Sequence, residues 1–130
     1  MRDKRRLLLH FVIDVYMSAP TDYDFYCDIA LQPGANIKKV FENEQVLAYH
    51  HTQPFWETHI VVIPKQHVWD LRVVEDPGLL AELLLVSRDI MRTIPQSEIN
   101  NKGAQLLTNL GKFQDIPHLH FHIAIGSKIR

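Results

Sequence analysis

Cysteine is nearly absent from this sequence, in which Cys27 is the only one among 130 residues. A single cysteine rules out an internal disulfide, and it cannot form a Cys-x-x-Cys metal site alone. A strong charge of either sign is also lacking, because the formal net charge is −1 with the eight histidines counted as neutral. This balance excludes bulk electrostatic attraction to nucleic acid or to a membrane surface, so local groups must hold any phosphate ligand. A reducing compartment is the default for such a chain, and the predicted location is the cytoplasm.

Long hydrophobic runs are missing as well. The apolar stretch at 7–13 follows four basic residues, is interrupted by His10 and is too short to cross a bilayer. It resembles a signal peptide only faintly, and Met17 would make an alternative start. We therefore interpret residues 1–16 as an N-terminal extension of uncertain role. Residues 17–130 form one domain in this interpretation, which is long enough to bury a core.

The pattern of apolar residues predicts a mixture of strands and helices. The pair Asp76-Pro77 predicts the start of a long helix, with Asp76 as its N-cap, and the helix should end near Ile94, before Pro95. A short helix or turn is predicted at 24–30, and a loop at 96–103. Five segments read as strands, namely 37–41, 45–49, 59–63, 104–108 and 118–125.

The segment 118–125 carries most of the functional information. Its sequence is His-Leu-His-Phe-His-Ile-Ala-Ile, so three histidines alternate with apolar residues. On a strand, His118, His120 and His122 would share one face, and the apolar residues would point toward a core. Positions i and i+2 are about 6.6 Å apart on a strand, so one ring can attack an atom while its neighbour holds a group bonded to that atom.

Two other interpretations of this triad of histidines remain open. His-x-His on a strand is a common pair of metal ligands, and Asp115, His59 or His51 would complete a metal site for a metal-dependent hydrolase. A purely structural triad is the second, although three aligned imidazoles pack a core poorly. Ordinary roles suit some neighbours: His67 is read as a surface or loop residue, and Cys27 as a small buried apolar side chain.

Several ordered motifs resemble the histidine triad (HIT) family. Its signature is His-φ-His-φ-His-φ-φ, where φ is apolar, and residues 118–124 match it at every position. The upstream segment 59–67, His-Ile-Val-Val-Ile-Pro-Lys-Gln-His, resembles a second family motif. Segments 25–29 and 40–49 resemble the family's N-terminal block, so the similarity covers roughly residues 22–125.

The resemblance implies an α+β fold with a five-stranded antiparallel sheet, one long helix and a short N-terminal helix. Members are often homodimers, and the leucines of the predicted long helix support this, because they lie on more than one of its faces. These are Leu79, Leu80, Leu83, Leu84 and Leu85.

The resemblance also implies a reaction. In the family, the middle histidine attacks the α-phosphorus of a nucleotide, so His120 would be the nucleophile. A neutral imidazole is competent near pH 7 because its unperturbed pKa is about 6.5. His122 and Gln114 match positions that contact the phosphate, and His118 and His59 match positions that orient the nucleophile. No cofactor is expected.

The nucleotide would contact a second group of residues. Tyr26 and Tyr49 fall where members place contacts to the base, which is a purine in the family, although both would fit a core equally well. Thr52 follows the ribose position, and Asn109 falls at an amide on the phosphate or sugar side. The full predicted set is Tyr26, Tyr49, His51, Thr52, Asn109, Gln114 and Asp115.

Three positions depart from the family pattern. His51 stands where an acidic residue usually holds the ribose hydroxyls, and Asp115 stands where Ser or Thr usually follows the glutamine. Some bacterial members bind structural zinc through two N-terminal cysteines and two histidines. Asp24 replaces the first cysteine here, so we expect no such zinc.

The sequence thus predicts a nucleotide-binding hydrolase or nucleotidyl transferase acting on nucleoside phosphoramidates or dinucleoside polyphosphates through a covalent nucleotidyl-histidine. The alternatives are a metal-dependent hydrolase that uses the three histidines and a nucleotide-binding protein with little turnover.

Overall fold

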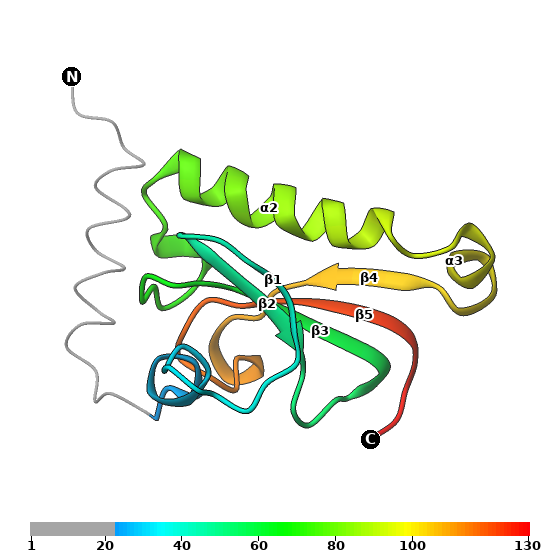
Figure 1. Cartoon of the computed structure of the whole chain (residues 1–130), viewed down its shortest axis with the longest axis horizontal. Coiled ribbons are helices and arrows are strands. Elements are labelled where there is room, and N and C mark those ends of the chain that lie inside the picture. The colour runs from blue at the N-terminus through cyan, green and yellow to red at the C-terminus, as the bar shows by residue number, and fades with distance from the viewer. Residues whose placement is uncertain (1–22) are drawn as a thin grey trace.

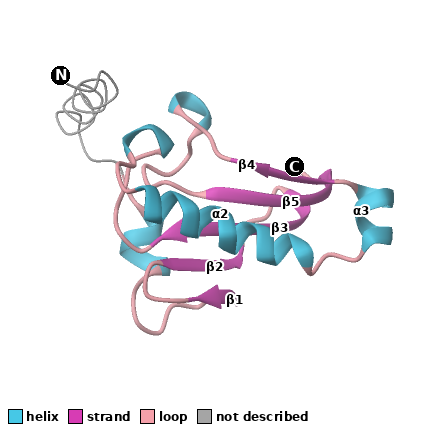
Figure 2. Cartoon of the chain, turned by 90° about the horizontal axis from the view of Figure 1, so that it is seen from above, coloured by secondary structure: helices cyan, strands magenta, loops and turns pink. Residues whose placement is uncertain are grey.

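The computed structural model describes residues 23–130, so the predicted extension 1–16 lies outside the described residues. Its centre is a five-stranded antiparallel sheet with the strand order β1-β2-β3-β5-β4 (Figures 1 and 2). Within 23–130, no helix is long and apolar enough to cross a membrane. The strands are β1 (Lys39–Glu42), β2 (Val46–His50), β3 (Trp56–Pro64), β4 (Ala104–Leu107) and β5 (Phe121–Lys128).

The long helix α2 (Pro77–Arg92) covers one face of the sheet (Figure 2). The side chain of Asp76 accepts a hydrogen bond of 2.8 Å from the backbone N–H of Gly78, which confirms the predicted N-cap. The predicted α+β fold is therefore correct. The described residues also form three short helical turns, namely η1 (Tyr26–Ala30), η2 (Leu71–Val73) and η3 (Gly111–Phe113).

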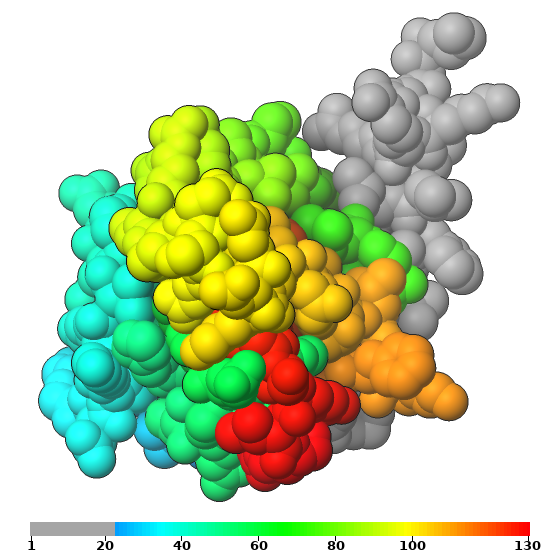
Figure 3. Space-filling model, turned by 90° about the vertical axis from the view of Figure 1, so that its right-hand side faces the viewer, coloured from blue at the N-terminus to red at the C-terminus, as the bar shows by residue number. Residues whose placement is uncertain are grey.

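The predicted loop at 96–103 is wrong, because this segment forms a second helix, α3 (Gln96–Lys102). It begins where the carbonyl of Pro95 accepts from two N–H groups, and it ends at Gly103, whose φ is +75°. The segment has only one apolar residue, Ile99, so apolar periodicity gave no sign of a helix. Figure 3 shows α3 standing out at this end of the molecule, above the C-terminal residues.

Side chains are buried on both faces of the sheet. On the α2 side, the apolar residues of segment 118–125 pack against the helix, as predicted. On the other face, a smaller apolar cluster includes Tyr26, Tyr49 and Val61 beneath the turn η1. The triad lies on this second face, where Tyr26 of η1 contacts the rings of His118 and His120, and His59 of β3 contacts the ring of His122.

The last strand begins later than predicted. β5 starts at Phe121 and runs to Lys128, whereas His118–His120 precede it. The backbone N–H of Leu119 donates instead to the carbonyl of Val68, at 2.6 Å, so the chain pairs with the 64–68 segment before it joins the sheet. His118 and His120 therefore lie just before the start of β5, beside a loop and η1.

Candidate active site

The candidate active site adjoins a cavity of about 210 Å³ next to the triad. Two of its lining residues contact the middle histidine: the ring of Tyr26 lies 5.0 Å from that of His120, and the carboxylate of Asp115 lies beside it. We call this space the aromatic cavity, because aromatic rings make up much of its wall. It is lined by Tyr23, Phe25, Tyr26, Tyr49, His51, Thr52, Gln53, Phe55, Asp115, Ile116 and Arg130.

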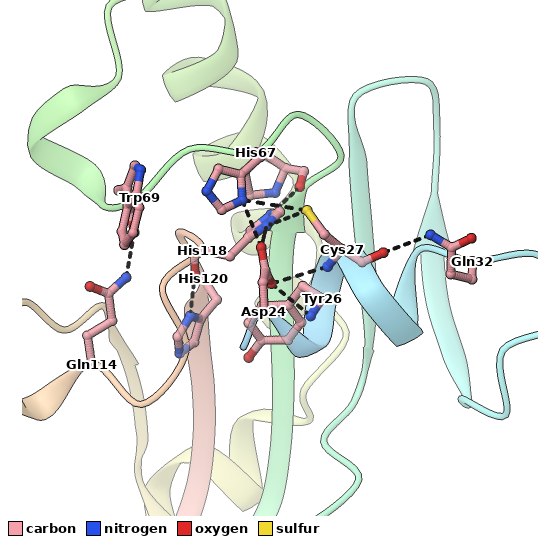
Figure 4. Close-up of polar contacts among 10 residues, drawn as sticks. Asp24, Tyr26, Cys27, Gln32, His67, Trp69, Gln114, His118 and His120 are labelled. Carbon is pink, nitrogen blue, oxygen red and sulfur yellow. Dashed lines mark hydrogen bonds and ion pairs between the residues drawn. The ribbon is translucent and has the colours of Figure 1, made fainter. Parts of the chain in front are cut away.

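The hydrogen bonds of His120 define its tautomer. Its Nδ1 lies 2.8 Å from the carbonyl oxygen of His118, which can only accept, so Nδ1 carries the proton (Figure 4). In the neutral ring Nε2 therefore has the lone pair, and this buried atom has no aligned hydrogen-bond partner, although Oδ1 of Asp115 lies 3.2 Å from it. Thr108 donates 2.8 Å to the carbonyl of His120 and so fixes the backbone at this position. A buried imidazole nitrogen with a free lone pair has the chemistry that nucleophilic attack requires.

A chain of hydrogen bonds sets the tautomer of His122 in the same way. The backbone N–H of Phe55 donates to Nδ1 of His59 at 3.1 Å, so the proton of the neutral His59 ring is on Nε2. That nitrogen is 2.7 Å from Nδ1 of His122 and donates to it. The proton of His122 is consequently on Nε2, where it can donate to a phosphate oxygen.

Both rings of this chain are neutral at pH 7. Burial, reinforced by the neighbouring histidines His51 and His122, lowers the pKa of His59 to about 3. Burial, and then the His120 ring, lowers the pKa of His122 to about 4. The site can therefore hold His122 as a neutral hydrogen-bond donor without charging it.

Asp115 occupies the space in front of Nε2 of His120. Its Oδ1 lies 3.2 Å from Nε2 of His120, although the two atoms are not aligned as a hydrogen bond. Interaction with the protonated form of the His120 ring lowers the pKa of Asp115 to about 2, although burial opposes this. The side chain is half exposed and can turn away. A phosphate approaching Nε2 would meet this negative charge.

The predicted contacts of the nucleoside meet around the aromatic cavity. Tyr26 and Tyr49 are almost fully buried and form its floor, while Thr52 lies at its exposed edge. His51 stacks on His59 at 4.3 Å between ring centroids. Its Nδ1 accepts 3.0 Å from the backbone N–H of Gln53, so Nε2 of the neutral ring can only donate to a ribose oxygen.

Two predicted residues lie apart from the aromatic cavity. Gln114 donates from its amide nitrogen to the backbone carbonyl of Trp69 at 2.5 Å, on the opposite side of His120 from Asp24 (Figure 4). One N–H of this amide remains for a phosphate. Asn109 is half-buried, two residues after β4, and does not line the cavity.

Arg130 is a site residue that the sequence did not indicate. Its guanidinium lies 4.2 Å from the ring centroid of Phe55 and donates to the carbonyls of Gln53 and Pro54. It brings a positive charge to the wall of the cavity. Only its place in three dimensions reveals this, because an arginine at the end of a sequence carries no local signal.

A second cluster lies behind His118 (Figure 4). Asp24, Cys27, His67 and His118 bring one ligand atom each to within 4.8 Å of one another, and in 23–130 no other group of three or more such residues does so. Oδ2 of Asp24 lies 2.7 Å from Nδ1 of His67 and 3.0 Å from Nδ1 of His118. Sγ of Cys27 lies 3.5 and 3.3 Å from the same two nitrogens. We call these four residues the Asp24 cluster.

The Asp24 cluster changes the interpretation of two residues. His67 and Cys27 were read as a surface residue and an apolar filler, but both contribute polar atoms to it. Burial raises the pKa of the Cys27 thiol to about 12, with the Asp24 carboxylate adding to the rise. The expectation that no such zinc binds stays a prediction: Asp24 stands where the sequence indicated, at the position of the missing cysteine, and its carboxylate lies beside Cys27, His67 and His118. An oxygen, a sulfur and two nitrogens form a donor set that fits zinc.

Comparison with known proteins shows what the chain is similar to. The family model described as HIT domain matches residues 33–128. An uncharacterised HIT-like protein of Helicobacter pylori (strain 26695) is 38% identical over 92 residues, which make up 69% of this chain and 85% of that protein.

Solved structures give the same result. A HIT family hydrolase from Legionella pneumophila has a TM-score of 0.68 and 28% identity, and the match covers 83% of this chain and 96% of the hydrolase. A hypothetical histidine triad nucleotide-binding protein from Sulfolobus tokodaii has a TM-score of 0.61 and 33% identity, with 70% and 61% covered.

Proposed function

Because the chain belongs to the HIT domain family, we propose that it is a nucleotide-binding hydrolase or nucleotidyl transferase. It acts at the α-phosphorus of nucleoside phosphoramidates or dinucleoside polyphosphates. The names of two similar structures, a HIT family hydrolase and a histidine triad nucleotide-binding protein, support the reaction class and the ligand class.

One observation carries this proposal: the free lone pair on Nε2 of His120. The hydrogen bond from Nδ1 to the His118 carbonyl removes the competing tautomer, and burial leaves Nε2 unpartnered. A metal ligand or a structural histidine would have this nitrogen occupied. An imidazole poised in this way fits covalent catalysis.

The reaction then has two steps. Nε2 of His120 forms a bond to the α-phosphorus, while the P–N bond of a phosphoramidate or the P–O bond of a polyphosphate breaks and the leaving group departs. Water next attacks the same phosphorus, the Nε2–P bond breaks and the imidazole regains its lone pair. The product is the nucleoside monophosphate. An alcohol or amine replacing water would give the transferase reaction.

Neutral hydrogen-bond donors would stabilise the negative charge that develops on the phosphate oxygens. Nε2–H of His122, held in this tautomer by His59, and the remaining amide N–H of Gln114 would donate to them. The nucleoside would lie in the aromatic cavity against Tyr26 and Tyr49. Asp115 must turn outward, toward the solvent to which it is half exposed, before a phosphate reaches Nε2.

The two alternative functions differ in their support. A metal site formed by the triad is disfavoured, because within residues 23–130 only the Asp24 cluster brings three or more possible ligand atoms to within 4.8 Å of one another. A nucleotide-binding protein with little turnover is favoured by one contact, that of Asp115 with His120. Turnover measurements separate this alternative from the main proposal.

We also propose a cytoplasmic homodimer. A free thiol at Cys27 suits a reducing compartment. Leu84 and Leu85 of α2 are 50% and 42% exposed, which leaves an apolar stripe on the outer side of the helix for a second copy.

The test is a panel of adenosine and guanosine phosphoramidates and dinucleoside polyphosphates, assayed with the wild type and His120→Asn. The wild type should hydrolyse at least one compound, and His120→Asn should lose several orders of magnitude in kcat. His50→Gln is the matched control, because His50 lies on β2 outside the cavity and should keep its activity. No turnover of any compound by the wild type would reject the enzyme and favour the binding protein.

A further inference from the structure

We propose that the aromatic cavity selects nucleotides that carry a further phosphate on the ribose, at the 2′ or the 3′ position, and that Arg130 and His51 recognise this phosphate. The inference rests on the proposed function, because the nucleoside must lie in this cavity with its α-phosphorus at His120. It narrows the substrates to phosphoramidates or anhydrides of nucleosides that already carry a phosphate on the ribose.

The charges along the wall of the cavity are separated. Among the described residues, the wall contains one cation, Arg130, and one carboxylate, Asp115. The carboxylate lies 3.2 Å from Nε2 of His120, at the end where the α-phosphate would bind. The guanidinium lies 4.2 Å from the ring centroid of Phe55, and the ring of His51 contacts the same side chain at 5.7 Å between centroids. The positive charge is therefore on the His51 side of the cavity.

His51 and Arg130 offer donors and no acceptor to a ligand. Nδ1 of His51 already accepts from the backbone N–H of Gln53 at 3.0 Å, so Nε2 of the ring can only donate. Burial lowers the pKa of His51, Asp115 opposes this and Arg130 adds to it, so the ring is neutral near pH 7. The proton of a ribose hydroxyl needs an acceptor, which neither residue provides. The oxygens of a phosphate only accept, so a phosphate matches both residues.

This arrangement has a counterpart in dinucleotide-binding folds. There a carboxylate binds the ribose hydroxyls, whereas a nearby arginine accommodates a phosphate on the ribose. The cavity has the second arrangement, with Arg130 in its wall and a histidine donor beside it.

Protein contacts hold the guanidinium of Arg130 in place. Its Nε and Nη2 donate to the carbonyls of Pro54 and Gln53, at 3.0 and 2.5 Å. The backbone N–H of Ile129 donates to the carbonyl of Phe55 at 2.8 Å, which fastens the chain beside the cavity. These bonds use two of the five guanidinium N–H groups, so three remain for a ligand. A planar group held in this way can bind two phosphate oxygens at once.

The reacting phosphate is a less suitable partner for Arg130. His122 would hold the α-phosphate, and its ring lies 6.4 Å from that of His51. Burial, and then the His120 ring, lower the pKa of His122, and Arg130 has no part in this shift. The contrast with His51 supports a role for Arg130 on the ribose side.

The test is calorimetric titration of the full chain with AMP, ADP, adenosine 2′,5′-bisphosphate and adenosine 3′,5′-bisphosphate. At least one bisphosphate should bind the wild type about 10–100-fold more tightly than AMP, the gain expected from charge-assisted hydrogen bonds to a phosphate. Comparison of the two bisphosphates identifies the position on the ribose. The preference should shrink as salt is added, because Arg130 is exposed.

Four variants assign the preference to residues. Arg130→Gln should remove it and leave the affinity for AMP within about twofold of wild type. Arg130→Lys should keep only part of it, because an ammonium group retains the charge but not the planar pair of donors. His51→Asp should reverse it, with tighter AMP binding and weaker binding of both bisphosphates. Lys128→Gln is the matched control, because this exposed lysine lies 6.0 Å from the Trp56 ring and does not line the cavity.

Several outcomes would overturn the proposal. Bisphosphates that bind no more tightly than AMP would reject it and leave the proposed function standing, since the His120→Asn assay tests that function separately. Equal losses of ADP and bisphosphate affinity in Arg130→Gln would assign the arginine to the phosphate chain. An equal loss in Lys128→Gln would show a general effect of charge. A wild type that binds none of the four nucleotides would reject the proposed function as well.

Discussion

His59 should act on catalysis only through the tautomer of His122, and His59→Leu tests this. The wild-type chain of hydrogen bonds, 3.1 Å from Phe55 to His59 and 2.7 Å from His59 to His122, keeps the His122 proton on Nε2. Leucine leaves Nδ1 of His122 with no donor, so nothing any longer holds the proton on Nε2 and the tautomer with the proton on Nδ1 becomes populated. The donor to the phosphate is then lost in that state.

The expected loss in kcat is about 10–100-fold, by analogy with the loss that follows removal of a partner that orients a metal-bound histidine. This corresponds to roughly 1.4–2.7 kcal/mol of transition-state stabilisation. KM should change little, because the bond forms between protein groups. Single-turnover and steady-state kinetics with a nucleoside phosphoramidate measure the effects on kcat and KM separately.

Two variants make the result specific to the tautomer. His59→Gln keeps an amide N–H and should recover part of the activity. His51→Leu removes the ring stacked on His59, but no bond to the triad, so it should change KM more than kcat. A kcat within twofold of wild type in a correctly folded His59→Leu would refute the reasoning.

Three further predictions concern binding, acid stability and assembly. Asp115→Ser should raise the affinity for AMP, more so at low salt, because it removes a carboxylate beside His120. His51→Asp should strengthen ribonucleotide binding and raise discrimination against 2′-deoxy analogues. Calorimetry that shows weaker AMP binding for both variants would contradict these assignments. Because the pKa values of His59 and His122 are about 3 and 4 in the folded state, the unfolded chain takes up their protons first. The contribution of these two groups to the free energy of unfolding should therefore be constant above about pH 6.5 and fall below it, by at most about 2.7 kcal/mol per pH unit for the pair; equal urea midpoints at pH 7 and pH 5 would be the contrary result. Light scattering at tens of micromolar should give a dimer, whereas a monomer would argue against the role of Leu84 and Leu85.

The sequence predicted the parts of the fold that have a local signal. Asp76 and Pro77 mark the start of α2, and the alternation after His118 separates the core face from the histidine face. The sequence did not predict α3, because its residues are polar all round and its ends depend on Pro95 and Gly103. The sequence also did not predict the late start of β5, because the backbone N–H of Leu119 bonds to Val68, which is distant in the sequence.

The candidate site likewise contains some residues that local motifs indicate and others that only the fold brings together. The triad, His59 and Gln114 could be named from motifs, because their spacing is fixed along the chain. The Asp24 cluster could not, since it joins residues 24, 27, 67 and 118, and a carboxylate replaces the expected thiolate. The tautomers likewise follow only from partners such as Phe55 N–H and the His118 carbonyl, which sequence alone does not place.

The covalent intermediate on His120 tests the central claim most directly. A rapid-quench reaction with a nucleoside phosphoramidate, followed by peptide mass spectrometry under conditions that preserve phosphoramidate bonds, would locate the nucleotidyl group. The account predicts one nucleoside monophosphate on Nε2 of His120 in the wild type, formed and consumed at rates consistent with turnover, and none in His120→Asn. Turnover with the group on another residue, or undiminished turnover in His120→Asn, would contradict it.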